Sequence, residues 1–259
     1  MKSTGIVTLV LLVSVAGTAM ADWDPKMGHK MHFPQLPDPN GWDVDFTTPK
    51  FLADDWKCSE TGPVDGIHFW VSHQGGVIPI INGLRVAIFD NIPANTGGLS
   101  YSRPGEQLWS ADMSTLNFQT AAGGVGKQGW FDPYTGEAIP NDHDSFFQIN
   151  LTEFTQPFTQ KEGEIYWVGI SLNTSNPDGW KSANLEKYPA PFTGQHYEDD
   201  AVYRDDKGGW HELRYPSIDP RYPGQSMDLA FVITPEPTSM ALLGLGALGV
   251  LFRRRRSRT

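Results

Sequence analysis

The stretch Gly66-Ile67-His68-Phe69-Trp70-Val71-Ser72 decides the fold. Its apolar residues Ile67, Phe69 and Val71 fall on one face of an extended chain, because successive side chains of a strand point to opposite sides. Such strict alternation is typical of a β-strand with one face in the core. The fold is therefore built outward from a strand over residues 66–72.

The same two-residue period recurs on both sides of this stretch. Residues 147–151 and 227–233 alternate in the same way, and further strands are predicted at 77–81, 84–89, 165–172, 200–203 and 210–214. No convincing helical stripe lies between the two chain ends, and 27 Gly with 20 Pro supply turns. This pattern predicts an all-β fold, specifically a jelly-roll-like β-sandwich in a single domain over residues 22–234.

Three segments are predicted as long loops. Residues 91–105, 120–144 and 173–195 are rich in Gly, Pro, Asn and Asp. Loops of this length in a compact domain are usually functional or mobile. The Pro-rich residues 25–39 are expected to form an extended arm docked on the sandwich.

The C-terminal residues 235–259 have the composition of a sorting signal. Pro235, Glu236 and Pro237 precede an apolar run over 240–252, and Arg253, Arg254, Arg255 and Arg256 follow it. Arginines behind an apolar segment hold that end on the cytoplasmic side. A run of 13 residues is short for a permanent anchor, which needs about 20, so we expect transient membrane insertion.

This order of parts resembles the PEP-CTERM signal of Gram-negative bacteria. The resemblance implies processing by an exosortase and delivery to the cell surface or the extracellular space. An ordinary C-terminal anchor is the alternative.

The N-terminus indicates export through the inner membrane. Lys2 precedes an apolar stretch over residues 6–15, and Ala19 and Ala21 form the small-x-small pattern that signal peptidase reads. Residues 1–21 are therefore predicted to be a signal peptide.

The exported part is strongly acidic. Residues 22–234 hold 14 basic and 29 acidic side chains, a charge of about −15. Nucleic acid is therefore not expected as a partner, because its phosphates would be repelled. The single cysteine, Cys58, has no intramolecular partner and is interpreted as a small buried side chain.

A second resemblance covers most of the exported part. The segments that carry it are 29–37, 41–44, 52–58, 66–70, 101–105, 166–167, 179–181 and 199–202. Together they resemble an uncharacterised domain common in exported PEP-CTERM proteins of planctomycete-like bacteria. The resemblance implies no catalytic residue.

Paired aspartates suggest a cation site. Asp54 and Asp55 precede an early predicted strand, and Asp199 and Asp200 precede a late one. Ca²⁺ takes several oxygen ligands from separate segments, so Asp54, Asp55 and Asp200 are its candidate ligands. Solvated strand-edge aspartates or turn formers are the alternative.

Aromatic side chains suggest a sugar-binding surface. Trp130, Trp180 and Trp210 lie in or beside irregular segments, among nine tryptophans. Exposed, they could stack on sugar rings of an extracellular polysaccharide; buried, they belong to the core.

Enzymatic function is not expected, and no catalytic residue is assigned. No nucleophile elbow, zinc-helix motif or phosphate-binding glycine loop is present in the sequence. The sequence thus predicts a structural or adhesive surface protein. The alternative is a carbohydrate-binding module, followed by a glycoside-hydrolase-like enzyme that uses the clustered carboxylates.

Overall fold

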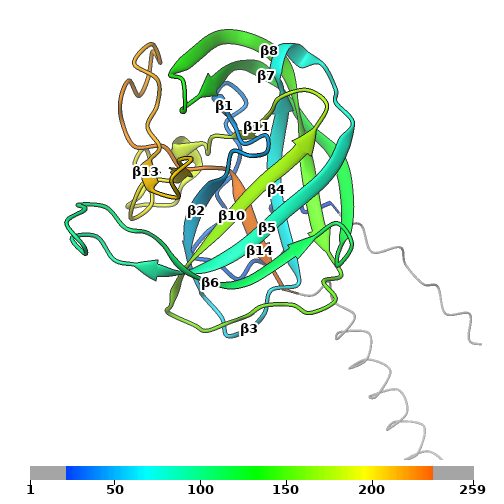
Figure 1. The fold of residues 1–259 in the computed structure, drawn as a ribbon, viewed down its shortest axis with the longest axis vertical. Helices are drawn as coiled ribbons and strands as arrows, with labels where there is room; N and C mark the ends of the chain where they lie inside the picture. The colour runs from blue at the N-terminus through cyan, green and yellow to red at the C-terminus, as the bar shows by residue number, and fades with distance from the viewer. Residues whose placement is uncertain (1–21, 236–259) are drawn as a thin grey trace, which may run out of the picture.

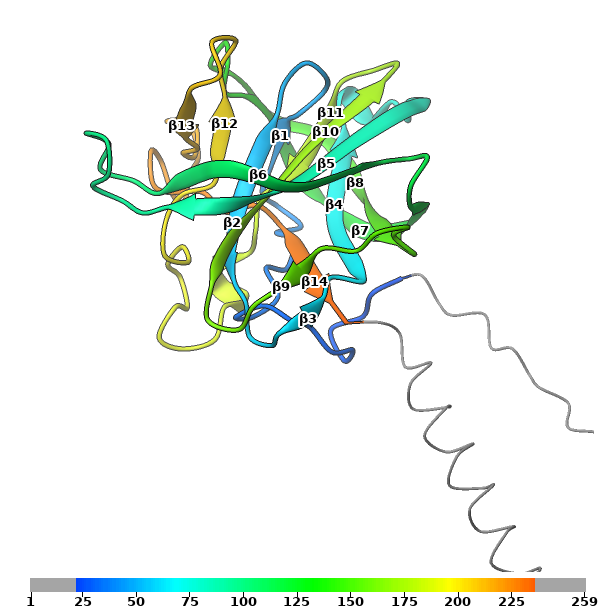
Figure 2. The same ribbon diagram turned by 60° about the horizontal axis from the view of Figure 1, so that its bottom comes forward.

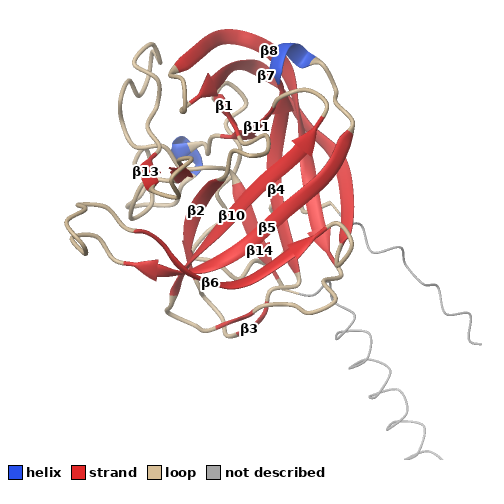
Figure 3. Ribbon diagram, viewed as in Figure 1, coloured by secondary structure: helices blue, strands red, loops and turns tan. Residues whose placement is uncertain are grey.

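The computed structural model describes residues 22–235, and it is built almost entirely of strands (Figure 3). The only helical elements are two short 3-10 turns, η1 (Gln74–Gly76) and η2 (Leu185–Lys187), among these residues. No helix in this part of the chain has the length and apolarity to cross a membrane. The predicted all-β class is confirmed. The signal peptide with Ala19 and Ala21, the apolar run, and residues Glu236, Pro237 and Arg253–Arg256 lie outside the described residues.

Two six-stranded sheets make up the domain (Figures 1 and 2). The first has the order β11 (Asp178–Lys181), β1 (Trp42–Asp45), β7 (Asn117–Asp132), β8 (Glu137–Thr152), β4 (Gly66–His73) and β14 (Phe231–Thr234). The second has the order β13 (Trp210–Glu212), β12 (Val202–Arg204), β2 (Leu52–Lys57), β10 (Ile165–Thr174), β5 (Ile81–Ile92) and β6 (Arg103–Asp112). A separate short pair joins β3 (Gly62–Pro63) to β9 (Thr159–Gln160).

The first sheet closes on itself. Because β11 pairs with both β1 and β4, the strands β11, β1, β7, β8 and β4 form a ring. Every pairing is antiparallel except that of β1 with β7. Alternation alone did not predict this closure, and the jelly-roll-like sandwich stays a prediction.

One core lies between the two sheets. The deciding strand β4 contributes Ile67, Phe69 and Val71 to it, as predicted, and β2 contributes Leu52 and Trp56 from the opposite sheet. Both faces of β4 are buried, since its other side packs within the ring. This explains why all eight of its residues are inaccessible to water.

The predicted loop over 120–144 is wrong. β7 and β8 pair across it as a long hairpin with bulges near Gly124. Its glycines are required by close approach: a Cβ on Gly126 would lie 1.9 Å from the Pro39 oxygen, and one on Gly129 would lie 2.5 Å from the Trp42 ring. Glycine here marks tight packing of a strand, which composition made look like a loop.

Two smaller predictions also need correction. Residues 77–80 are not a strand, because β5 begins only at Ile81, and the apolar Val77, Ile78 and Ile80 are exposed. The predicted loop 173–195 contains the end of β10, β11 and η2. The arm is docked as predicted: Lys30 N donates to Ile233 O at 2.8 Å, and Gln35 bridges to Phe231.

Candidate functional site

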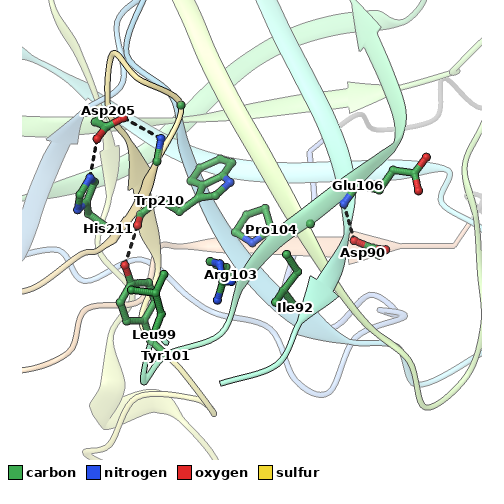
Figure 4. A pocket seen from close by; sticks show the side chains of 13 residues that line it. Asp90, Ile92, Leu99, Tyr101, Arg103, Pro104, Glu106, Asp205, Trp210 and His211 are labelled. Carbon is green, nitrogen blue, oxygen red and sulfur yellow. Dashed lines mark hydrogen bonds and ion pairs between the residues drawn. The ribbon is translucent and has the colours of Figure 1, made fainter. Parts of the chain in front are cut away.

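An open cleft of about 690 Å³ lies between two hairpins of the second sheet (Figure 4). One wall is the β5–β6 hairpin, with its connecting residues 93–102. The other is the β12–β13 hairpin, whose turn includes Asp205 and Gly208. Sequence analysis predicted a loop over 91–105, and the structure shows residues 93–102 of it as one side of this cleft.

The aromatic part of the cleft is Trp210. Its indole extends from β13 toward Pro104 (Figure 4) and is only half-buried. Behind it, a small apolar cluster on the outer face of the sheet holds the ring, with centroids of Phe89 at 5.9 Å and Phe51 at 6.2 Å. The Arg204 guanidinium lies over the same ring, 5.6 Å from its centroid.

The other two tryptophans considered from sequence belong to the core. Trp130 is 1% exposed and Trp180 is fully buried, where its Nε1 donates to Ala230 O at 2.9 Å. The core interpretation holds for both, and Trp210 alone of the three lines the cleft.

Polar groups surround the indole. The Arg103 guanidinium points into the cleft, and its buried Nη1 has no hydrogen-bond partner. Asp90 Oδ1 accepts from Glu106 N at 2.6 Å, an approach that requires Gly105, since a Cβ there would lie 2.2 Å from that oxygen. Sequence analysis quoted Arg103 only as part of a family segment. Arg103 becomes a candidate site residue because its Nη1 lacks a hydrogen-bond acceptor, and only the structure shows this.

Hydrogen bonds fix the two walls against each other. Tyr101 Oη donates to Trp210 O at 2.7 Å, and Ser102 N donates to Asp199 Oδ2 at 2.6 Å. The β12–β13 turn is held by Asp205, which accepts from Gly209 N at 2.7 Å and contacts His211 Nε2 at 2.8 Å. The bond from His211 lowers the pKa of Asp205. The cleft is therefore shaped before any ligand arrives.

The predicted cation ligands occupy two different environments. Asp54 is fully buried in β2, where Oδ1 accepts from Asp55 N at 2.8 Å and Oδ2 accepts from Leu229 N at 2.6 Å. The Gln35 side-chain nitrogen, with the amide turned to donate, lies 3.0 Å from the same Oδ2. Asp54 thus anchors the segment that leads into β14.

Asp55 and Asp228 form the interior of an acidic cluster. Asp55 is 1% exposed, and its Oδ1 has no partner. Burial raises its pKa, and Asp228, Asp199 and Glu198 raise it further. Asp228 Oδ2 accepts from Tyr197 N at 2.8 Å and from Tyr188 Oη at 3.0 Å, and burial raises the pKa of Asp228 to about 7.

Asp200 belongs to the outer part of this cluster. Its carboxylate, with those of Asp199 and Glu212, forms a group of oxygens that lie within 4.8 Å of one another. Arg214 Nη2 lies 3.2 Å from Asp200 Oδ2 and 2.8 Å from Glu212 Oε1. Burial raises the pKa of Asp200 to about 8, although Arg214 opposes the shift.

The structure therefore divides the predicted triad. Asp200 lies with Asp199 and with Glu212, a residue that sequence reasoning missed because it is isolated in the chain. Asp54 and Asp55 lie on β2, which pairs with β12 through Ala53 and Val202. β2, which sequence analysis did not predict, is thus a neighbour of β12, and the Ca²⁺ site itself stays a prediction.

A second buried carboxylate, Asp43, has a different environment. Lys181 Nζ lies 3.2 Å and His143 Nε2 3.0 Å from Asp43 Oδ2, and both partners are inaccessible to water. Burial opposes protonation of His143, yet its bond to Asp43 raises the pKa of the ring. Here cationic side chains balance a buried charge, whereas Arg214 alone touches the acidic cluster from its rim.

Two family profiles match the chain. One, described as a domain of unknown function (DUF7901), matches residues 31–234. The other, described as the PEP-CTERM protein-sorting motif, matches residues 234–256. No curated protein and no solved structure matches. The sorting motif and the uncharacterised domain predicted from the sequence are thus confirmed, and the planctomycete-like distribution stays a prediction.

Proposed function

The chain belongs to the DUF7901 family and ends in a PEP-CTERM sorting motif, and from this premise we propose that it is a non-enzymatic adhesive or structural protein of the cell surface. The motif indicates an exported protein that an exosortase processes, at the cell surface or in the extracellular space. The role of the domain after sorting is the proposal.

The position of the cleft relative to the sorted end carries the proposal. The described chain ends at Pro235, directly after β14, and the docked arm lies beside that end, where Gly28 approaches Pro235. Both views place this end at the lower right and the two cleft hairpins at the left (Figures 1 and 2). A domain held to the surface through its C-terminus would present the cleft outward.

A buried core built on a closed ring of strands suits this role. The ring of β11, β1, β7, β8 and β4 leaves few exposed strand edges, which otherwise invite association with other chains. The only cysteine of the sequence, Cys58, is buried as predicted. The domain is therefore held together without an intramolecular disulfide. The fold therefore offers a rigid support for a surface-exposed binding region.

Carbohydrate binding is the second candidate, and the cleft favours it. A half-buried indole beside arginine and carboxylate side chains combines an apolar face with hydrogen-bonding groups. Such a surface would let the protein adhere to an extracellular polysaccharide. This candidate gives the adhesive role a chemical mechanism.

Loss of the gene in the native cell tests the adhesive role. Cells that lack the protein should release more matrix material and adhere less to surfaces than the parent strain, and the full chain should restore both. Unchanged adhesion and matrix retention would overturn the proposal.

Processing is tested separately by intact-mass analysis of protein from the native cell surface. If an exosortase cleaves at the motif that contains Pro235, Glu236 and Pro237, the mature protein should lack Arg253 to Arg256. Surface protein that keeps the arginines would contradict processing at this motif.

A further inference from the structure

We propose that the cleft binds neutral saccharides, with Arg103 as the hydrogen-bond donor that anchors the ligand and Trp210 as the apolar face. This inference rests on the proposed adhesive function and specifies its ligand. It starts from an arginine that lacks a partner in a domain with an excess of carboxylates.

Arg103 differs from the other described arginines in having a buried nitrogen without an acceptor. Residues 22–234 carry about twice as many acidic as basic side chains, yet among the described residues Arg103 makes no ion pair, and its buried Nη1 has no acceptor. Arg214 contacts Asp200 and Glu212, and Arg221 contacts Asp38. Among the described residues Arg85 and Arg204 also lack a carboxylate partner, but their side chains donate to Gln107 and Gly208. A buried donor without an acceptor is costly, and the rest of the half-buried Arg103 guanidinium lines the cleft, where a ligand oxygen can accept from it.

The surroundings of Arg103 favour a neutral ligand. Asp90, Glu106 and Asp205 line the same cleft, so a carboxylate or phosphate would meet three negative groups. Among the lining residues the other basic group is His211, which is already paired with Asp205 at 2.8 Å. Arg204, beside the cleft, lies over Trp210 and donates to Gly208 O at 3.4 Å. Hydroxyl groups can accept from Arg103 and donate to Asp90 without bringing a charge.

The apolar wall favours a sugar ring over a smaller alcohol. Trp210 on one wall extends toward Pro104 on the other, with Ile92 near Arg103 (Figure 4). The C–H face of a hexose ring packs on such a surface while its hydroxyls point to the polar side chains. A volume of about 690 Å³ has room for a short oligosaccharide segment.

Preorganisation supports binding at so open a site. The bonds from Tyr101 to Trp210 and from Ser102 to Asp199 join the connecting residues 93–102 to the opposite hairpin. Walls that are already fixed lose little conformational freedom when a ligand binds. The cleft therefore needs no rearrangement to accept a sugar.

A glycan array with the mature protein from the native cell tests the proposal. The probes are gluco-, manno-, galacto- and xylo-oligosaccharides, with oligogalacturonides as the acidic comparison. We expect binding to one or more neutral series, with an affinity by calorimetry that changes little between low and high salt. A preference for oligogalacturonides, or binding that weakens steeply with salt, would overturn the neutral ligand.

Matched variants locate the site. Arg103→Gln and Trp210→Ala should each weaken binding about tenfold or more. Two control variants, Arg85→Gln and Trp109→Ala, should leave the affinity unchanged. Arg85 is exposed on β5 and does not line the cleft. Trp109 is the other half-buried tryptophan, and it donates to Gln156 O outside the cleft. If Trp210→Ala fails to fold, Trp210→Phe keeps the packing on Phe51 and should still weaken binding. Full affinity in both Arg103→Gln and a folded Trp210 variant would overturn the proposal.

The glycan-binding test and the cell-adhesion test can fail independently of each other. A protein that binds no glycan on the array but whose loss still reduces cell adhesion would overturn this inference and leave the adhesive role standing. If loss of the protein changes nothing in the cell and no glycan binds, both are overturned.

Discussion

The closed ring and the cleft each contain a tryptophan, but the two side chains have different roles. Trp180 on β11 is fully buried against Phe46, Phe69 and Phe231, whereas Trp210 on β13 is half-buried at the cleft. Both follow glycine in the sequence and look alike there. Their neighbours in space decide that one holds the core together while the other is available to a ligand.

A similar contrast separates the buried carboxylates. Asp43 faces Lys181 and His143, so its charge is balanced inside the ring. The cluster of Asp55, Asp199, Asp200 and Asp228 reaches the cleft wall, where Asp199 accepts from Ser102 N, and Arg214 is its one cationic contact among the described residues. The carboxylate charge of Asp43 in the ring is balanced by cationic side chains. The carboxylates on the cleft side need a proton, a cation or a ligand to balance theirs.

The tryptophan comparison predicts the largest effect. Trp180→Ala should lower the free energy of unfolding by about 3–5 kcal/mol, because it removes a large side chain from a packed core. Trp210→Ala should cost clearly less, since the ring is partly exposed and leaves no closed cavity. Denaturant unfolding of both variants measures the difference. Equal losses of unfolding free energy would contradict the assignment of Trp180 to the core and Trp210 to the cleft.

The carboxylate comparison predicts a pH effect. Asp200 and Asp228 have pKa values of about 8 and 7 in the folded protein, far above about 3.9 for an unfolded chain. The folded state keeps protons that the unfolded chain has lost, so stability falls as pH rises through these values. Between pH 6.5 and 8.5 we expect a loss on the order of 2 kcal/mol.

The lower limit of this window is set by histidine. Burial lowers the pKa of His68 to about 4, so the contribution of His68 to stability rises with pH up to about 6.5 and opposes the carboxyl effect there. Above pH 6.5 His68 no longer changes the stability, so the loss caused by the carboxyl groups is measured without it. Melting temperatures across the window measure it. Asp200→Asn should remove most of the dependence, Asp228→Asn should remove a smaller part because its pKa of about 7 lies near the lower limit, and Asp144→Asn, an exposed matched control, should remove none. A flat profile in the unmutated protein would contradict the raised pKa values.

A cation should act on the same cluster with a smaller effect. If Ca²⁺ binds at Asp200 with its neighbours, adding it to chelator-treated protein at ten times its dissociation constant should stabilise the fold by about 1.4 kcal/mol. Asp200→Ala should abolish the rise in melting temperature. No shift in the unmutated protein would leave Asp54, Asp55 and Asp200 as structural carboxylates.

Local sequence patterns predicted the strands that alternate and missed those that do not. β4, β5 and β10 follow from apolar alternation, because each places one face in the core. Part of the β7–β8 hairpin was taken for a loop, because its glycines reflect contacts with Pro39, Trp42 and Phe146 that lie elsewhere in the chain. Ring closure by β11 depends on pairings over more than a hundred residues, which no local period encodes.

The candidate sites were predictable only in part. Paired aspartates pointed to the acidic cluster, but Glu212 joins it through the β12–β13 pairing of Val202 with Glu212. Trp210 was one of three tryptophans that sequence could not separate. Arg103 became a candidate only when its buried Nη1 proved to lack an acceptor.

The indole N–H resonances of the nine tryptophans test the central claim most directly. All nine lie within the described residues, and seven of them are buried in the fold. When the mature protein is titrated with neutral oligosaccharides, we predict that the Trp210 signal shifts while those of Trp180 and the half-buried Trp109 stay in place. A Trp210 signal that does not move with any neutral series, or a shift of Trp109 in its stead, would contradict the account.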